Sequence, residues 1–138
     1  MPGSNVAFKE FNVQIGYHKD VKSPYRHLWI RPTSSDDAPV SGVFVLFVDE
    51  RTPDAGFGYY NPDNKWVVGF ALNRDFDSTY QLLRSGKDLL FRWWADEKNK
   101  MVWFQFAGNH GVKAKFLESA EALLQEQRVP TLAERPSD

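Results

Sequence analysis

Residues 88–108 read DLLFRWWADEKNKMVWFQFAG, and this stretch decides how the chain folds. Two runs rich in apolar and aromatic residues flank a polar segment, Asp96–Asn99, so the pattern predicts two strands joined by a turn. Side chains that face each other across an antiparallel pair lie on the same side of a sheet. A four-residue turn therefore predicts the pairs Trp93–Val102, Arg92–Trp103 and Phe91–Phe104.

The predicted hairpin has two unlike faces. One is entirely apolar and is expected to line the core, and it consists of Leu89, Phe91, Trp93, Val102, Phe104 and Phe106. The other combines apolar side chains with polar groups that need hydrogen-bond partners, and it consists of Leu90, Arg92, Trp94, Met101, Trp103 and Gln105. This mixed face needs a cover, which is the rest of the chain, a ligand or a second copy of the protein.

The length of 138 residues is typical of one domain. We expect a single domain over residues 1–128 and a flexible C-terminal tail over residues 129–138, because the last segment has two prolines and few apolar residues to bury. The chain has no cysteine, which excludes disulfides and thiolate chemistry.

Charge and hydropathy argue against two kinds of partner. The formal net charge is −1, with basic and acidic residues intermixed, so no long-range field would attract a nucleic acid. No apolar run approaches the roughly 20 residues that a membrane-spanning helix needs. The first ten residues, MPGSNVAFKE, lack the basic and apolar regions of a secretion signal. We therefore expect a cytoplasmic protein that binds neither nucleic acid nor membrane.

The rest of the chain predicts more strands and two helices. Strands are expected at residues 11–17, 25–31, 42–48, 57–60 and 66–72, with residues 1–5 loose and residues 32–41 an exposed loop. Residues 42–48 are apolar at every position, which favours a central strand with both faces covered. The predicted fold class is α+β: a curved, mainly antiparallel sheet of about six strands with two helices. A short helix is expected within residues 75–86, capped by Asp77 or Ser78. An amphipathic C-terminal helix is expected over residues 112–127, packed on one face of the sheet, for which the core side is the nearest candidate.

The candidate ligand-binding residues come from the mixed face. Rings with a few convergent polar groups are typical of a small-molecule pocket, because the rings supply buried area and the polar groups fix orientation. The strand at residues 25–31 adds a similar row, since Tyr25, His27, Trp29 and Arg31 alternate with Leu28 and Ile30. The predicted binding residues are Tyr25, His27, Trp29, Arg92, Trp94, Met101, Trp103 and Gln105.

Two functional hypotheses use this face. The first is a protein that binds a small apolar or aromatic ligand in an aromatic, Arg-lined face or pocket, which a homodimer interface could frame. The alternative is a homo-oligomeric interaction module without a ligand, because Trp, Met and Arg are enriched at subunit interfaces. Binding of single-stranded nucleic acid also uses rings on a sheet, but the basic groove that it requires is lacking. Sugar binding by exposed Trp residues is a further hypothesis, and the lack of a secretion signal disfavours it.

The sequence contains no recognisable catalytic motif. There is no GxSxG elbow, no phosphate loop and no complete dinucleotide fingerprint. The three histidines, His18, His27 and His110, do not have the spacing of metal ligands, so we expect neither a metal nor a cofactor. A third hypothesis is an enzyme that uses His27 as a base near neutral pH.

Overall fold

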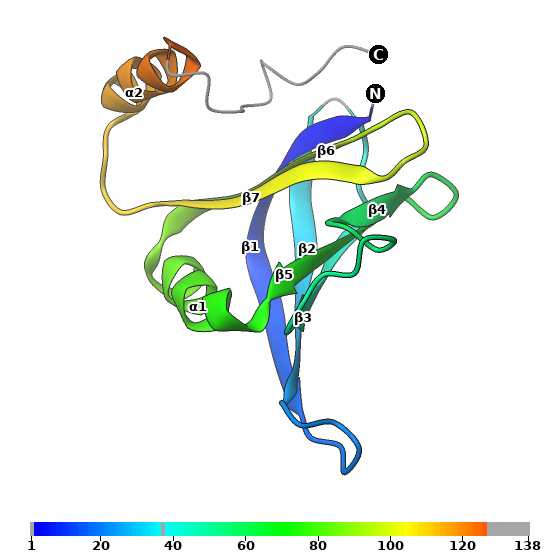
Figure 1. Cartoon of the computed structure of the whole chain (residues 1–138). Helices are drawn as coiled ribbons and strands as arrows, with labels where there is room; N and C mark the ends of the chain where they lie inside the picture. The colour runs from blue at the N-terminus through cyan, green and yellow to red at the C-terminus, as the bar shows by residue number, and fades with distance from the viewer. Residues whose placement is uncertain (1, 37, 127–138) are drawn as a thin grey trace.

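The computed structural model describes residues 2–36 and 38–126, which form one mixed seven-stranded sheet and two α-helices (Figure 1). The strands are β1 (Gly3–Gly16), β2 (Tyr25–Ser35), β3 (Gly42–Val48), β4 (Gly58–Asn61), β5 (Trp66–Leu72), β6 (Lys87–Ala95) and β7 (Met101–Asn109). A 3-10 turn, Asn73–Asp75, leads into α1 (Phe76–Ser85), and α2 (Ala114–Glu126) follows β7. The α+β class is confirmed, and the seven strands correspond to the five strand ranges and the hairpin that the sequence predicts.

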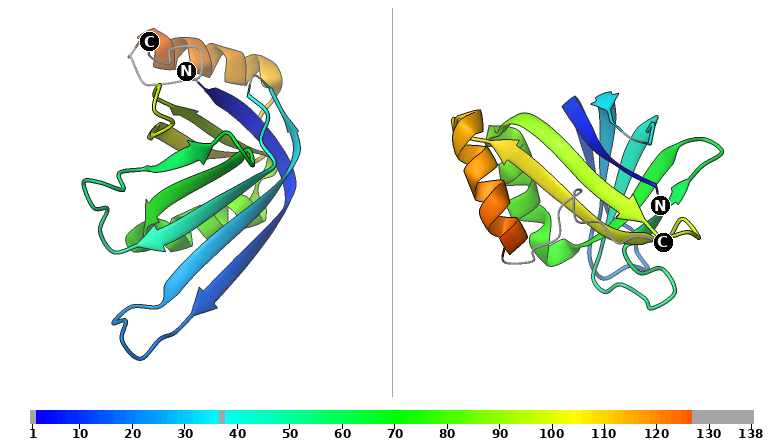
Figure 2. Two further views of the ribbon diagram at one scale, coloured as in Figure 1. Left: turned by 90° about the vertical axis from the view of Figure 1, so that its right-hand side faces the viewer. Right: turned by 90° about the horizontal axis from the view of Figure 1, so that it is seen from above.

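The sheet has the strand order β4-β5-β3-β2-β1-β6-β7, and every neighbouring pair except β3–β5 is antiparallel. Shifts of register near Phe8 bend β1 in its middle, so the sheet curls into a half-barrel (Figure 2). At one end the two edges meet, because Tyr59 of β4 bridges to Lys100, and the Tyr60 backbone N–H donates to the Asn99 carbonyl at 2.8 Å.

The inside of the half-barrel is filled with aromatic rings. Tyr60 stacks on Trp93 with ring centroids 4.8 Å apart, and Phe91 lies 5.7 Å from Phe104. The side of β5 that carries Val67, Gly69 and Ala71 faces inward, and Gly69 lets the ring of Phe104 approach closely. A ligand site is therefore better sought on the outside of the sheet.

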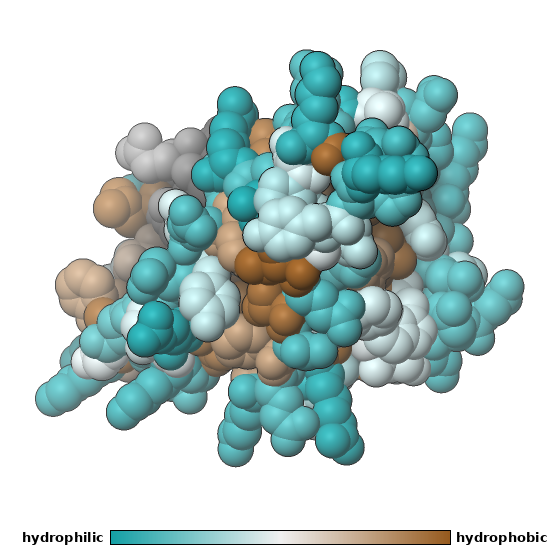
Figure 3. Space-filling view, turned by 90° about the horizontal axis from the view of Figure 1, so that it is seen from below, coloured by the Kyte–Doolittle hydropathy of each residue, from teal (hydrophilic) through white to brown (hydrophobic). Residues whose placement is uncertain are grey.

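Helix α1 covers the lower end of the half-barrel. Its buried Phe76 packs edge-on against Phe47 of β3 at 5.0 Å, and its Leu83 is buried in the same core. Seen from below, an apolar area lies amid hydrophilic side chains at this end (Figure 3). The depression between α1 and strands β1 to β3 holds only about 10 Å³, which is too small for a ligand.

The ends of two strands differ from the prediction. Residues 3–5 are not loose, because β1 begins at Gly3 and Ser4 is fully buried. The Ser4 hydroxyl accepts a hydrogen bond of 2.7 Å from the indole N–H of the fully buried Trp93. The expected loop at residues 32–41 is shorter, since β2 continues to Ser35.

The β6–β7 hairpin forms as predicted, but its register is shifted by two residues. The observed pairs are Phe91–Phe106, Arg92–Gln105, Trp93–Phe104, Trp94–Trp103 and Ala95–Met101. A shift of two preserves the faces, so Arg92 and Trp103 do lie on the same side. A bulge between the pairs Trp94–Trp103 and Ala95–Met101 exchanges the sides on which Met101 and Val102 lie. Met101 is therefore buried in the core, whereas Val102 is 40% exposed. The prediction was wrong for both of these residues.

Helix α2 lies over the outer side of the hairpin and not over the core side, where we expected it. Its Glu121 forms an ion pair with Arg92, whose side chain points away from the core residues Phe91 and Trp93. The sheet interior is already occupied by rings and by α1, so no apolar core surface remains for α2 to cover. The predicted tail, residues 129–138, lies outside the described residues. No helix in the described ranges is both long and apolar enough to cross a bilayer.

Candidate functional site

The two predicted aromatic rows lie on the same outer side of the sheet, but far apart. Strand β1 separates them: Arg92 of β6 pairs with Asn5, whereas Trp29 of β2 pairs with Asn12. Seven residues along a strand correspond to about 23 Å at about 3.3 Å per residue. The rows are therefore two separate surfaces, and they have different surroundings.

The row on β2 is part of a continuous line of rings, which we call the aromatic track. It consists of Tyr25, His27 and Trp29 of β2, Phe44 of β3 and Trp66 of β5. Successive ring centroids lie close together: Tyr25–His27 at 5.3 Å, His27–Phe44 at 5.1 Å, Phe44–Trp29 at 4.5 Å and Trp29–Trp66 at 6.0 Å. Tyr25 is 40% exposed and Trp29 is 37% exposed. The track thus presents rings to solvent along three strands.

Glycines set the position of the rings at both ends of the track. Gly42 pairs with Trp66, and a Cβ atom on Gly42 would lie only 2.5 Å from the indole ring. Gly16 pairs with Tyr25, and a Cβ atom there would overlap the phenol ring. Each ring therefore lies across a glycine, close to the backbone of the sheet. A ring held in this way keeps its other side free for stacking.

Polar side chains of β1 run beside the track. Glu10, Asn12 and Gln14 are exposed and pair with Arg31, Trp29 and His27, in that order. Glu10 and Arg31 form an exposed ion pair at 3.4 Å. For the amides of Asn12 and Gln14 we find no hydrogen bond to any other described residue. An amide group carries both donors and an acceptor, so this row can bind hydroxyl groups in either role.

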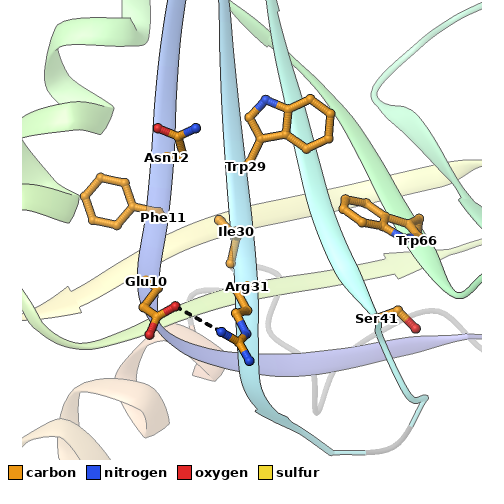
Figure 4. Close-up of a pocket in the computed structure, with 8 residues that line it drawn as sticks. All are labelled: Glu10, Phe11, Asn12, Trp29, Ile30, Arg31, Ser41 and Trp66. Atoms are coloured by element: carbon orange, nitrogen blue, oxygen red, sulfur yellow. Dashed lines mark hydrogen bonds and ion pairs between the residues drawn. The ribbon is translucent and has the colours of Figure 1, made fainter.

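One end of the track and part of the polar row line an open groove of about 370 Å³ (Figure 4). It is lined by Glu10, Phe11 and Asn12 of β1, Trp29, Ile30 and Arg31 of β2, and Ser41 and Trp66. Trp29 and Asn12 stand next to each other above the strands, and the Glu10–Arg31 pair closes one end (Figure 4). The volume is within the range of small-molecule sites, which begins near 300 Å³.

Comparison with known proteins gives no guide to this groove. No protein-family model, curated protein or solved structure matches the chain. Its function must therefore be inferred from the chemistry of the site itself.

His27, on which the enzyme hypothesis rests, does not line the groove. His27 lies between the rings of Tyr25 and Phe44, and within the part of the chain that is described it forms no ion pair or hydrogen bond with a carboxylate. No group of three potential metal ligands comes together in residues 2–36 and 38–126. Among the described residues, His27 therefore has no carboxylate partner of the kind that a general base uses.

The predicted residues of the hairpin lie at the second surface. Trp94 and Trp103 stack with centroids 4.5 Å apart, Arg92 approaches Glu121 of α2, and Gln105 is exposed. Met101 belongs to the core and is not part of any surface. Of the eight predicted binding residues, Tyr25, His27 and Trp29 lie on the track, and four lie at the hairpin.

Sequence reasoning missed Phe44, Trp66 and Asn12 as site residues. Phe44 lies in a strand that is apolar at every position, so the pattern does not show which side faces outward. Trp66 lies beside Trp29 because β3 and β5 pair in parallel, which is a non-local feature. The signal available for Trp66 was alternation in residues 66–72, which places Trp66 on one side of the strand with Val68, Phe70 and Leu72.

Proposed function

We propose that this protein is a non-catalytic binding domain and that the aromatic track binds a neutral saccharide chain. The observation that carries the proposal is a continuous line of five rings, two exposed and three half-buried, with a parallel row of amide and charged side chains. This arrangement lies outside the core, so packing of the half-barrel does not account for the exposure of its rings.

The chemistry of saccharides matches both rows. The C–H faces of a pyranose ring are apolar and pack on the negatively charged face of an aromatic ring. The hydroxyl groups at its edge both donate and accept hydrogen bonds, as do the amides of Asn12 and Gln14. The open groove beside Trp29 suits a chain that passes along the surface, because neither helix lies in front of β2, β3 and β5 (Figure 2).

The charge of the site disfavours a polyanionic ligand. Among the described residues, Arg31 is the one basic side chain that lines the groove, and Glu10 neutralises it at 3.4 Å. A protein that holds a nucleic-acid backbone needs several uncompensated basic residues. A neutral ligand is therefore the better fit.

Calorimetric titration with neutral hexasaccharides of different linkage tests the proposal. Trp29→Ala removes a ring that contacts two neighbours in the track, and an aromatic contact is worth about 0.5–1.5 kcal/mol, so affinity should fall about two- to tenfold. Asn12→Ala should also weaken binding. Phe116→Ala is the control, since Phe116 is 66% exposed on α2 and should leave affinity unchanged. If no hexasaccharide binds the unaltered protein, the proposal is wrong.

Self-association through the same side of the sheet is a second candidate. The outer side chains of β3 are only half-buried, contrary to the expectation that both faces of this strand are covered. Leu46 pairs with Phe70 of β5, and Phe44 pairs with Val68, which forms an apolar area beside the track. A second copy could cover this area. Sedimentation analysis would detect the dimer, and Leu46→Lys should then give monomers; a monomer at all concentrations would exclude this candidate.

A further inference from the structure

Three buried polar atoms lie together on the outer side of β1 and β6. They are Asn5 Oδ1, Arg92 Nε and Trp94 Nε1, and none has a hydrogen-bond partner among the described residues. Asn5 pairs directly with Arg92, and Gly3 pairs with Trp94 one position further along that face. Trp94 is only 2% exposed. A buried polar atom without a partner is costly, so three at one place indicate a group that is meant to bind there.

The orientation of Asn5 is fixed by its other hydrogen bonds. Its amide nitrogen donates to Asp36 Oδ2 at 3.0 Å, and its backbone N–H donates to Asp36 Oδ1 at 2.6 Å. The remaining oxygen, Oδ1, is an acceptor, whereas Arg92 Nε–H and Trp94 Nε1–H are donors. The complementary group offers two acceptors and one nearby donor. An α-amino acid has this combination, with a carboxylate for the two donors and an ammonium for Asn5.

A groove lies next to this cluster along β1 and β6, although Asn5, Arg92 and Trp94 do not line it. This groove of about 370 Å³ begins at Ala7 and Leu90, the next outward-facing pair after Asn5 and Arg92. Its lining includes two basic residues, Lys9 and Lys87, and one acidic residue, Asp88, so its net charge favours a carboxylate.

Helix α2 covers this cluster only loosely. Glu121 Oε1 lies 3.7 Å from Arg92 Nη1, which is too long for a hydrogen bond. Phe116, Leu117 and Leu123 are 66%, 44% and 56% exposed, so these apolar side chains contribute little to docking α2 on the sheet. A weak ion pair and little apolar burial allow α2 to move away at small cost.

We propose that the Asn5–Arg92–Trp94 cluster is a binding site for the α-amino carboxylate group of a free amino acid, and that Glu121 is its internal competitor. The carboxylate of the ligand takes the place of the Glu121 carboxylate near Arg92 and also accepts the Trp94 indole N–H. This site lies about 23 Å from the aromatic track along β1, at about 3.3 Å per residue, and does not depend on the saccharide proposal.

Nuclear magnetic resonance of the tryptophan indole N–H groups tests the site directly. On titration with L-leucine, the Trp94 resonance should move downfield as it gains an acceptor. The Trp93 indole N–H already donates to Ser4 and should stay in place. L-Leucinamide lacks the carboxylate, and 4-methylpentanoate lacks the amine, so both should bind more weakly than leucine. Equal affinity for leucine and 4-methylpentanoate would overturn the role of Asn5. If none of the three compounds shifts the Trp94 resonance, the proposed site is wrong.

Variants of α2 and β6 provide a second readout. Glu121→Gln removes the competing carboxylate and should tighten leucine binding about two- to fivefold, as expected for the loss of a partly exposed ion pair. Glu126→Gln is the matched control, because it lies about 140° further around the helix. Arg92→Lys keeps the charge but loses the guanidinium N–H groups, and it should weaken binding about tenfold. Unchanged affinity in both Glu121→Gln and Arg92→Lys would contradict the proposal.

Discussion

The substitution Gly42→Ala should disrupt one end of the aromatic track, while the same change at Gly69 should not. A Cβ atom on Gly42 would lie 2.5–2.8 Å from three atoms of the Trp66 indole, so the ring must leave its position. At Gly69, a Cβ atom would lie 3.6 Å from Val45 and 3.7 Å from Phe104, which are ordinary contact distances. Overpacking typically costs about 1–3 kcal/mol, so we expect that loss for Gly42→Ala. Gly69→Ala should be neutral or stabilising by about 0.5–1 kcal/mol, because Gly is unfavourable in a strand.

Urea denaturation followed by tryptophan fluorescence would measure both free energies of unfolding. The displaced Trp66 should also weaken saccharide binding in Gly42→Ala, whereas affinity should be retained in Gly69→Ala. Equal stability and equal affinity of the two variants would refute the claim that Trp66 lies across Gly42.

Three further predictions concern the framework that holds the two surfaces. Ser4→Ala leaves the buried indole N–H of Trp93 without its acceptor. It should lower the free energy of unfolding, measured by urea denaturation, by about 1–3 kcal/mol. An unchanged free energy of unfolding would show that β1 does not begin before residue 5. In the same measurement, Met101→Ala should lower the free energy of unfolding by about 2–5 kcal/mol, because Met101 is in the core. Val102→Ala should lower it much less, because Val102 is 40% exposed, and the reverse order would contradict the observed register. Asp96→Ala removes an acceptor shared by the backbone N–H groups of residues 98 and 100. It should lower the free energy of unfolding by about 1.5–3 kcal/mol, which a lower melting temperature would show.

The faces of the β6–β7 hairpin could be predicted from the sequence because alternation is a local property. Its register could not, because it depends on the turn. Asp96 accepts hydrogen bonds from the backbone of Lys98 and Lys100, and Asn99 adopts a left-handed conformation with φ of 65°. Together with the bulge beside Trp94, this turn shifts the pairing by two residues and turns Met101 inward.

The candidate site was predicted only in part, because non-local pairing assembles it. Tyr25, His27 and Trp29 were visible as an alternating row on one strand. The sequence contains no signal for the parallel pairing of β3 with β5, which places Trp66 at the end of that row. The amphipathic pattern of α2 showed that the helix needs a surface, but not which side of the sheet supplies it.

Resonances of the five tryptophan indoles during a titration with neutral hexasaccharides test the central claim most directly. If the aromatic track binds the sugar chain, the Trp29 and Trp66 resonances should shift with saturation, and the resonance of the fully buried Trp93 should remain still. If the Trp29 and Trp66 resonances stay unchanged with every linkage tested, the track does not bind saccharides.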